Sequence, residues 1–89
     1  MIAKRVVVGG RVQGVGFRAW MVREARSLGV WGWVRNRADG TVEAVVHGET
    51  DAVGELLRRC RRGPMLASVS SVDETDTDPP DGEGFRQLG

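Results

Sequence analysis

Hydrophobic positions along the chain change period several times, and each change predicts a new element. A valine-dense run predicts a strand over residues 4–9. The helical spacing that follows predicts a helix over 19–28, because an apolar stripe runs along one side of it, formed by Phe17, Trp20, Met21, Ala25 and Leu28. Strands are expected over 30–36, with Trp31, Trp33 and Arg35 on one side, and over 41–47, with Val42, Ala44 and Val46 on one face. The turn at 37–40 predicts that they form a hairpin.

The second half of the chain repeats this order. Thr50 or Asp51 is expected to cap a second helix, which ends at Gly63-Pro64 and has an apolar stripe of Val53, Leu56, Leu57 and Cys60. A strand is expected over 67–75, an acidic loop over 76–84 and a short edge strand over 85–88. The predicted fold is α+β and ferredoxin-like: a βαββαβ sandwich in which one mainly antiparallel sheet carries two helices on one face.

Composition adds limits to this picture. The 89 residues suffice for one domain, 1–89, and three tryptophans contribute to its small core. Net charge is +1, but residues 1–62 hold twelve basic and six acidic side chains, whereas residues 63–89 hold one and six. The single cysteine, Cys60, is expected to be buried and excludes an internal disulfide. No apolar run approaches the length of a membrane span, so no membrane association and a cytoplasmic location are expected.

The stretch from Gly9 to Arg18 is the richest in candidate chemistry. Four glycines within ten residues join the first strand to the first helix and allow a close backbone approach to a ligand. Free N–H groups at the start of a helix bind anions, and the Arg18 guanidinium can bind two phosphate oxygens at once. The stretch therefore predicts a phosphate-binding turn.

Several known phosphate and nucleotide motifs fail here. A Walker loop needs Lys and Ser or Thr where Val15 and Gly16 stand. Gly14, Gly16 and Ala19 fit a dinucleotide fingerprint, but the acidic residue expected after the next strand is missing. An RNA-binding sheet needs aromatic residues on its central strands, and only Trp31 and Trp33 are available. One histidine without a nearby cluster of carboxylates or thiols offers no metal site.

Two other features have plainer interpretations. The arginines between Arg58 and Arg62 suit the negative end of the second helix dipole, although a phosphate or RNA patch is the alternative. His47 is expected at a strand end in solvent and not in acid–base catalysis.

Two segments together resemble a known family. Residues 10–18, Gly-Arg-Val-Gln-Gly-Val-Gly-Phe-Arg, resemble the first signature of acylphosphatases. Gly32-Trp33-Val34-Arg35-Asn36, followed by Gly40, Val42 and Gly48, matches every fixed position of the second signature. The resemblance extends over roughly residues 4–88, with 85–88 as its loosest part.

The resemblance implies hydrolysis of acyl phosphates to a carboxylate and inorganic phosphate, without metal or cofactor. Arg18 matches the arginine that binds the phosphate, and Asn36 matches the asparagine that holds the attacking water. Gln13, Gly14, Val15, Gly16 and Phe17 match the backbone loop around the phosphate oxygens. Inorganic phosphate is expected to be a competitive inhibitor, nucleic acid is not expected to bind, and a monomer is expected. A binding module of the same fold without catalysis is the main alternative.

Overall fold

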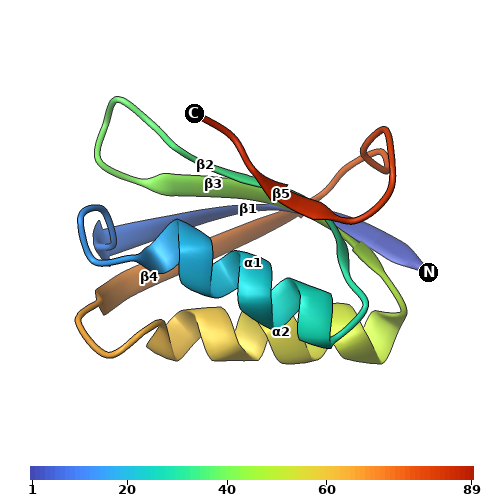
Figure 1. The fold of residues 1–89 in the computed structure, drawn as a ribbon, viewed down its shortest axis with the longest axis horizontal. Coiled ribbons are helices and arrows are strands. Elements are labelled where there is room, and N and C mark those ends of the chain that lie inside the picture. Colours follow the sequence, from blue (N-terminus) through green and yellow to red (C-terminus); the bar gives the residue numbers. More distant parts are fainter.

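The computed structural model describes residues 1–89, and its seven elements follow one another in the predicted order. Two helices cover one face of a five-stranded sheet, as Figure 1 shows. The elements are β1 (Ile2–Arg11), α1 (Phe17–Ser27), β2 (Trp31–Asn36), β3 (Val42–Gly48), α2 (Thr50–Arg62), β4 (Ser68–Asp76) and β5 (Phe85–Gln87). The strands lie in the order β4-β1-β3-β2-β5. All neighbours pair antiparallel except β2 and β5, so the predicted α+β, ferredoxin-like sandwich is confirmed.

The core lies between the helices and the sheet, and the apolar stripes predicted from the sequence form it. Val53, Leu56, Leu57 and Cys60 of α2 are all buried. On α1, Phe17, Met21 and Ala25 are buried, while Trp20 and Leu28 are partly buried against the same core. The strands contribute valines from their inner faces, including Val6, Val8, Val34, Val42 and Val46. Neither helix has the length and apolar character needed to cross a bilayer.

Two of the predicted local details are wrong. The first strand is longer than 4–9, because β1 pairs with β3 from Ile2 and with β4 as far as Arg11. Helix α2 begins at Thr50 with Glu49 as its N-cap, and no side chain caps it, so neither Thr50 nor Asp51 has the capping role. The length of β1 depends on its pairing with strands that are distant in the sequence, so the local sequence does not predict it.

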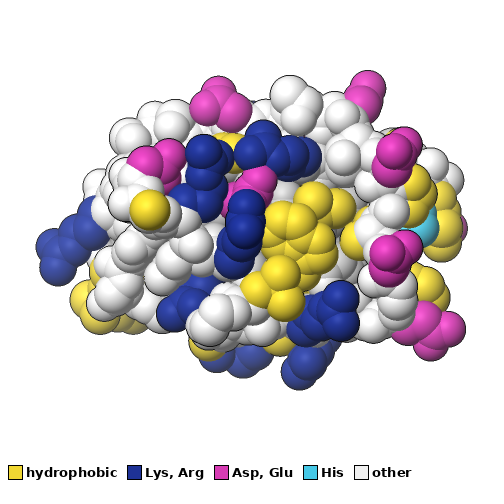
Figure 2. All heavy atoms as spheres, turned by 90° about the horizontal axis from the view of Figure 1, so that it is seen from above, with side chains coloured by type: hydrophobic (Ala, Val, Ile, Leu, Met, Phe, Trp, Pro, Cys, Tyr) yellow, Lys and Arg dark blue, Asp and Glu magenta, His cyan; other side chains and the backbone are white.

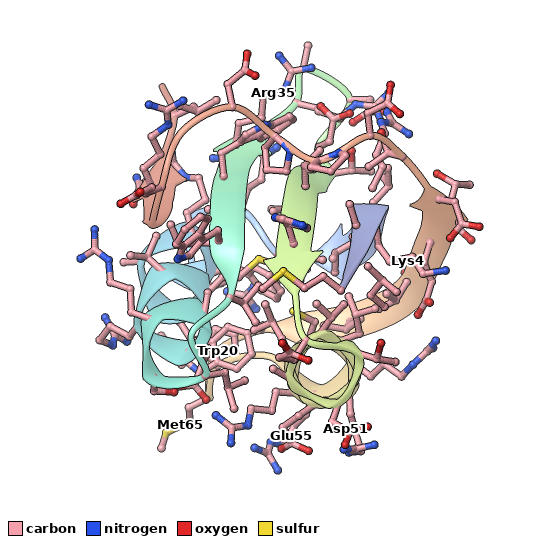
Figure 3. All side chains as sticks on the ribbon, turned by 90° about the vertical axis from the view of Figure 1, so that its right-hand side faces the viewer. Lys4, Trp20, Arg35, Asp51, Glu55 and Met65 are labelled. Atoms are coloured by element: carbon pink, nitrogen blue, oxygen red, sulfur yellow. The ribbon has the colours of Figure 1, made fainter.

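The outer face of the sheet is open to solvent and carries apolar side chains beside a group of basic ones (Figure 2). Arg35 lies on this side, opposite Asp51 and Glu55 of α2 (Figure 3). The Glu43 carboxylate is 4% exposed and accepts hydrogen bonds from Arg5 and Arg35, each with a 2.6 Å distance to Nε. Burial raises the pKa of the Glu43 carboxyl, but the two arginines lower it by more, so that it lies below its ordinary value. This ion triad joins β1, β2 and β3.

Candidate active site

The predicted phosphate-binding turn begins with an irregularity in β1. The register between β1 and β4 shifts between Gly9 and Gly10, and Gly10 has a φ of +114°. A Cβ atom at Gly10 would lie 2.3 Å from the carbonyl oxygen of Ser68, so no other residue fits without a backbone shift. The bulge bends β1 where the chain leaves the sheet for the turn.

The turn itself carries an uncapped helix N-terminus. Gly14 and Gly16 have φ values of +73° and +78°, the left-handed conformation that glycine adopts most easily. Helix α1 begins at Phe17, no side chain caps it, and its first turn has no acidic residue. The first helical hydrogen bond runs from Trp20 N to Gly16 O at 3.0 Å. The N–H groups before Trp20 therefore have no partner inside the helix and form a site of partial positive charge.

Buried apolar residues hold both ends of the turn in place. Val12 and Phe17 are each 1% exposed and belong to the core. The Phe17 ring packs edge-to-face with Trp20, with ring centroids 5.3 Å apart. A glycine between them can therefore take an unusual conformation without loosening the turn as a whole.

A cavity of about 210 Å³ lies at this helix N-terminus and brings the two key candidates together. Its lining residues are Val12, Gly14, Gly16, Phe17, Arg18, Ala19, Asn36 and Gln87. Arg18 and Asn36, which are distant in sequence, share this cavity. Of the predicted loop, Gly14, Gly16 and Phe17 line it, whereas Gln13 and Val15 do not.

The Arg18 side chain is held at the cavity by the C-terminal segment. Its Nη1 atom lies 3.1 Å from the carbonyl oxygen of Gly89 and 3.5 Å from that of Leu88. Arg18 is the second residue of α1, so its guanidinium adds a full positive charge to the partial charge of the helix N-terminus.

Asn36 enters the cavity from the end of β2. It is the last residue of the strand and pairs with Val42 at the start of β3. Its Oδ1 atom is buried and has no hydrogen-bond partner in the protein. A buried acceptor without a partner costs free energy, so the unpartnered amide oxygen of this cavity-lining residue is a candidate for a ligand or water contact.

The sequence did not reveal the part that the last strand plays in this site. The pairing of β5 parallel to β2 brings Gln87 to the cavity and Leu88 to Arg18. A short edge strand over 85–88 was predicted, but its neighbour was not. No local signal could have identified it, because the partner of an edge strand depends on the whole sheet.

The remaining candidate residues lie elsewhere. Cys60 is fully buried, and burial raises the pKa of its thiol to about 12, so it is not a nucleophile at neutral pH. His47 is five residues along β3 from Val42, a separation of about 17 Å in an extended strand. No group of three or more His, Cys, Asp or Glu side chains is placed to hold a metal ion.

The arginine cluster of α2 is largely engaged in ion pairs. Arg58 and Arg59 both contact Glu55, and Arg59 also reaches Glu24 of α1 at 3.4 Å. Arg61 lies 3.6 Å from Glu74 of β4, a pair with one end in the acidic part of the chain. These contacts favour the structural interpretation of the cluster over a phosphate or RNA patch.

Comparison with known proteins agrees with the two signatures. The acylphosphatase family model matches residues 4–87. An acylphosphatase of Acidiphilium cryptum (strain JF-5) is 62% identical over 85 residues, which cover 96% of this chain and 93% of that protein. The crystal structure of acylphosphatase from Bacillus subtilis has a TM-score of 0.93 at 33% identity, with both chains covered completely.

A second solved structure gives the same result. The acylphosphatase from Coxiella burnetii superposes with a TM-score of 0.93 at 37% identity, covering 98% of this chain and 92% of that one. The resemblance found in the sequence is thus confirmed by family model, by relatives and by structure. The chain belongs to the acylphosphatase family.

Proposed function

We propose that the cavity at the start of α1 binds the phosphate group of an acyl phosphate, and that Asn36 positions the water molecule that attacks it. As a member of its family the chain is a hydrolase, which converts an acyl phosphate and water into a carboxylate and inorganic phosphate. The observation that carries the assignment of roles is that Asn36, whose amide oxygen has no partner in the protein, lines the same cavity as Arg18 and an uncapped helix N-terminus.

The phosphate is bound by groups that carry positive charge or partial positive charge. Free N–H groups of the cavity-lining residues between Gly14 and Ala19 donate to its oxygens, as helix N-termini do in other phosphate sites. The Arg18 guanidinium adds charge-assisted hydrogen bonds to two of these oxygens. Phosphoryl transfer spreads negative charge over three equatorial oxygens in the transition state, so donors fixed in place beforehand lower the barrier.

Asn36 serves the water and not the phosphate. Its amide oxygen accepts a hydrogen bond from the water and so directs a lone pair toward phosphorus. An amide is not a base at neutral pH, so Asn36 cannot remove a proton. A non-bridging oxygen of the substrate phosphate therefore takes the proton from the water. His47 is too distant to replace it.

The leaving group makes metal or acid assistance unnecessary. A carboxylate is stable as an anion, so the bond from phosphorus to the acyl oxygen breaks without protonation of that oxygen. The protein has only to align phosphate and water and to stabilise charge. We therefore expect hydrolysis of benzoyl phosphate to continue in excess EDTA. Loss of activity in EDTA would refute the metal-independent mechanism, and absence of hydrolysis in any buffer would favour the non-catalytic binding module.

The roles of Arg18 and Asn36 are separated by one pair of measurements. We expect Asn36→Ala to reduce kcat for benzoyl phosphate by about 100-fold or more while the inhibition constant of inorganic phosphate stays unchanged. His47→Ala is the control and should keep the pH–rate profile of the parent protein. Equal loss of turnover and phosphate inhibition in Asn36→Ala would contradict the role in water binding.

We also propose a monomer in a reducing, cytoplasmic compartment that does not bind nucleic acid. The free thiol of Cys60 supports the reducing compartment, and the ion pairs of the arginine cluster support the absence of nucleic acid binding. Light scattering and salt-dependent RNA binding would test them, because an RNA patch predicts steeply salt-sensitive affinity.

A further inference from the structure

The Gln13 side chain makes a contact that the proposed chemistry does not use. Its amide nitrogen Nε2 lies 2.8 Å from the carbonyl oxygen of Arg37 and 2.9 Å from that of Thr41. Gln13 stands at the beginning of the phosphate-binding turn, yet it does not line the cavity. Its side chain is instead directed across to the turn between β2 and β3.

The two acceptors lie on the two arms of that turn. Arg37 directly follows Asn36, and Thr41 directly precedes Val42, the residue that pairs with Asn36. A backbone hydrogen bond from Arg37 N to Thr41 O, 2.9 Å long, closes the turn. The Gln13 amide therefore binds both arms at the point where Asn36 leaves the sheet.

A primary amide suits this position chemically. It offers two N–H groups on one nitrogen, and here each has a carbonyl acceptor. A carboxylate of the same shape has no hydrogen to donate, and an apolar side chain leaves the Arg37 carbonyl without this partner. Each carbonyl also accepts one backbone hydrogen bond, Arg37 O from Gly40 N and Thr41 O from Arg37 N, so the Gln13 amide adds a second, part-buried donor to both.

We propose that Gln13 is a positioning residue that fixes the distance between the phosphate-binding turn and Asn36. The inference rests on the proposed roles of Arg18 and Asn36. One half of the site is on the turn after β1 and the other is at the end of β2, and the Gln13 amide is a direct side-chain link between them. Small errors in the placement of a reacting water slow a reaction by about 100-fold, so a link of this kind affects turnover without touching the substrate.

A double-mutant cycle tests the proposal. Gln13→Met keeps length and neutrality but removes both N–H groups, and we expect kcat for benzoyl phosphate to fall by about 10- to 100-fold. The inhibition constant of inorganic phosphate should stay within about twofold, because the cradle and Arg18 remain. In the Asn36→Ala background, Gln13→Met should cause little further loss, since the water is no longer held.

Arg35→Gln is the matched control. It removes a side-chain tether of similar size, the contact to Glu43, directly beside Asn36 but without a link to the phosphate-binding turn. We expect it to lower the unfolding temperature and to leave kcat close to that of the parent. Unfolding of each variant is followed by circular dichroism, so that kcat is compared only among folded proteins.

The outcomes distinguish the two proposals. Turnover unchanged in Asn36→Ala would refute the water-binding role, and the role of Gln13 with it. Turnover lost in Asn36→Ala but kept in Gln13→Met would refute the Gln13 proposal alone. Additive losses in the double variant, or a weaker phosphate inhibition in Gln13→Met, would also overturn it, because they would assign Gln13 to general stability or to phosphate binding.

Discussion

Two arginines of α1 offer a direct test of what Arg18 contributes. Arg18 donates to the carbonyl oxygens of Leu88 and Gly89, and Arg26 donates to that of Phe85 through Nε and Nη2 at 3.2 and 3.0 Å. Both side chains thus hold the segment that contains β5, but only Arg18 lines the cavity. Replacing each with glutamine removes the same kind of backbone contact and the same charge.

Arg26→Gln should lose more stability than Arg18→Gln, whereas Arg18→Gln should lose more activity. The Arg18 contacts measure 3.1 and 3.5 Å and one of them is exposed, so Arg18→Gln should cost less than about 1 kcal/mol in the free energy of unfolding. The Arg26 contacts are part-buried, so Arg26→Gln should cost about 1–2 kcal/mol. At about 4–8 °C per kcal/mol for a domain of this size, the second loss is visible in a thermal melt.

Activity should show the reverse order. Loss of one preorganised transition-state contact costs about 2.7–4 kcal/mol, so Arg18→Gln should lower kcat/KM for benzoyl phosphate by about 100- to 1,000-fold. Phosphate inhibition should weaken in the same variant, whereas Arg26→Gln should keep both values close to those of the parent protein. Hydrolysis is followed at low ionic strength, where charge–charge interactions are least screened.

One result would refute this reasoning. If Arg18→Gln and Arg26→Gln lost activity in proportion to their losses of unfolding temperature, Arg18 would act by holding β5 and not by binding phosphate. Wild-type phosphate inhibition in Arg18→Gln would lead to the same conclusion.

Three further predictions concern the turn, the ion triad and the core. Gly14 and Gly82 have similar φ values, +73° and +82°, and open space where a methyl group would be added, so each alanine variant should lose about 1–2 kcal/mol of stability. Only Gly14→Ala should also lose kcat/KM. Equal activity of the two variants would contradict a role for the left-handed turn. Because the folded pKa of Glu43 lies below its ordinary value of 4.5, its ionised form stabilises the fold above that pH, and this contribution disappears as the pH falls through the folded pKa. Glu43→Gln should therefore cost about 1–2 kcal/mol of unfolding free energy in urea titrations at pH 7, because the half-exposed arginine partners limit the loss. The stability difference between variant and parent should shrink below about pH 4. A difference independent of pH would refute the role of the Glu43 charge. Leu56→Ala, at a fully buried position, should cost about 2–5 kcal/mol, and a melting temperature equal to that of the parent would show that the site collapses around the smaller side chain.

Much of the fold was predictable because its signals are local. The valines of β1, the stripe of Val53, Leu56, Leu57 and Cys60, and the glycine turn each depend on neighbours within a few residues. Local spacing decides which face of an element is apolar, and the buried residues of both helices follow it. Arg18 and Asn36 were predicted as a pair because two signatures occurred together, and the structure places both at one cavity.

Side-chain partners were much less predictable. The arginines from Arg58 to Arg62 were expected to suit the negative end of the helix dipole, but their partners on α1, α2 and β4 were not predicted. Glu43 lies on the opposite face of β3 from Val42 and Ala44, which predicts that it is exposed. It is instead buried between two guanidinium groups from adjacent strands. The pairing of Glu43 depends on strand register, which no single segment of sequence specifies.

By itself, the sequence determined the order of the elements, the apolar faces and the glycine turn before α1, and it singled out Arg18 and Asn36 as candidates. The tertiary structure alone decided that β5 lies beside β2, that its end reaches Arg18, and that the Gln13 amide joins the turn to the β2–β3 hairpin. The physical reason is the sequence separation over which each interaction acts. Periodicity and turn chemistry act between residues a few positions apart, whereas the distance from Gln13 to Thr41, or from Arg18 to Gly89, is set by how the whole sheet is assembled.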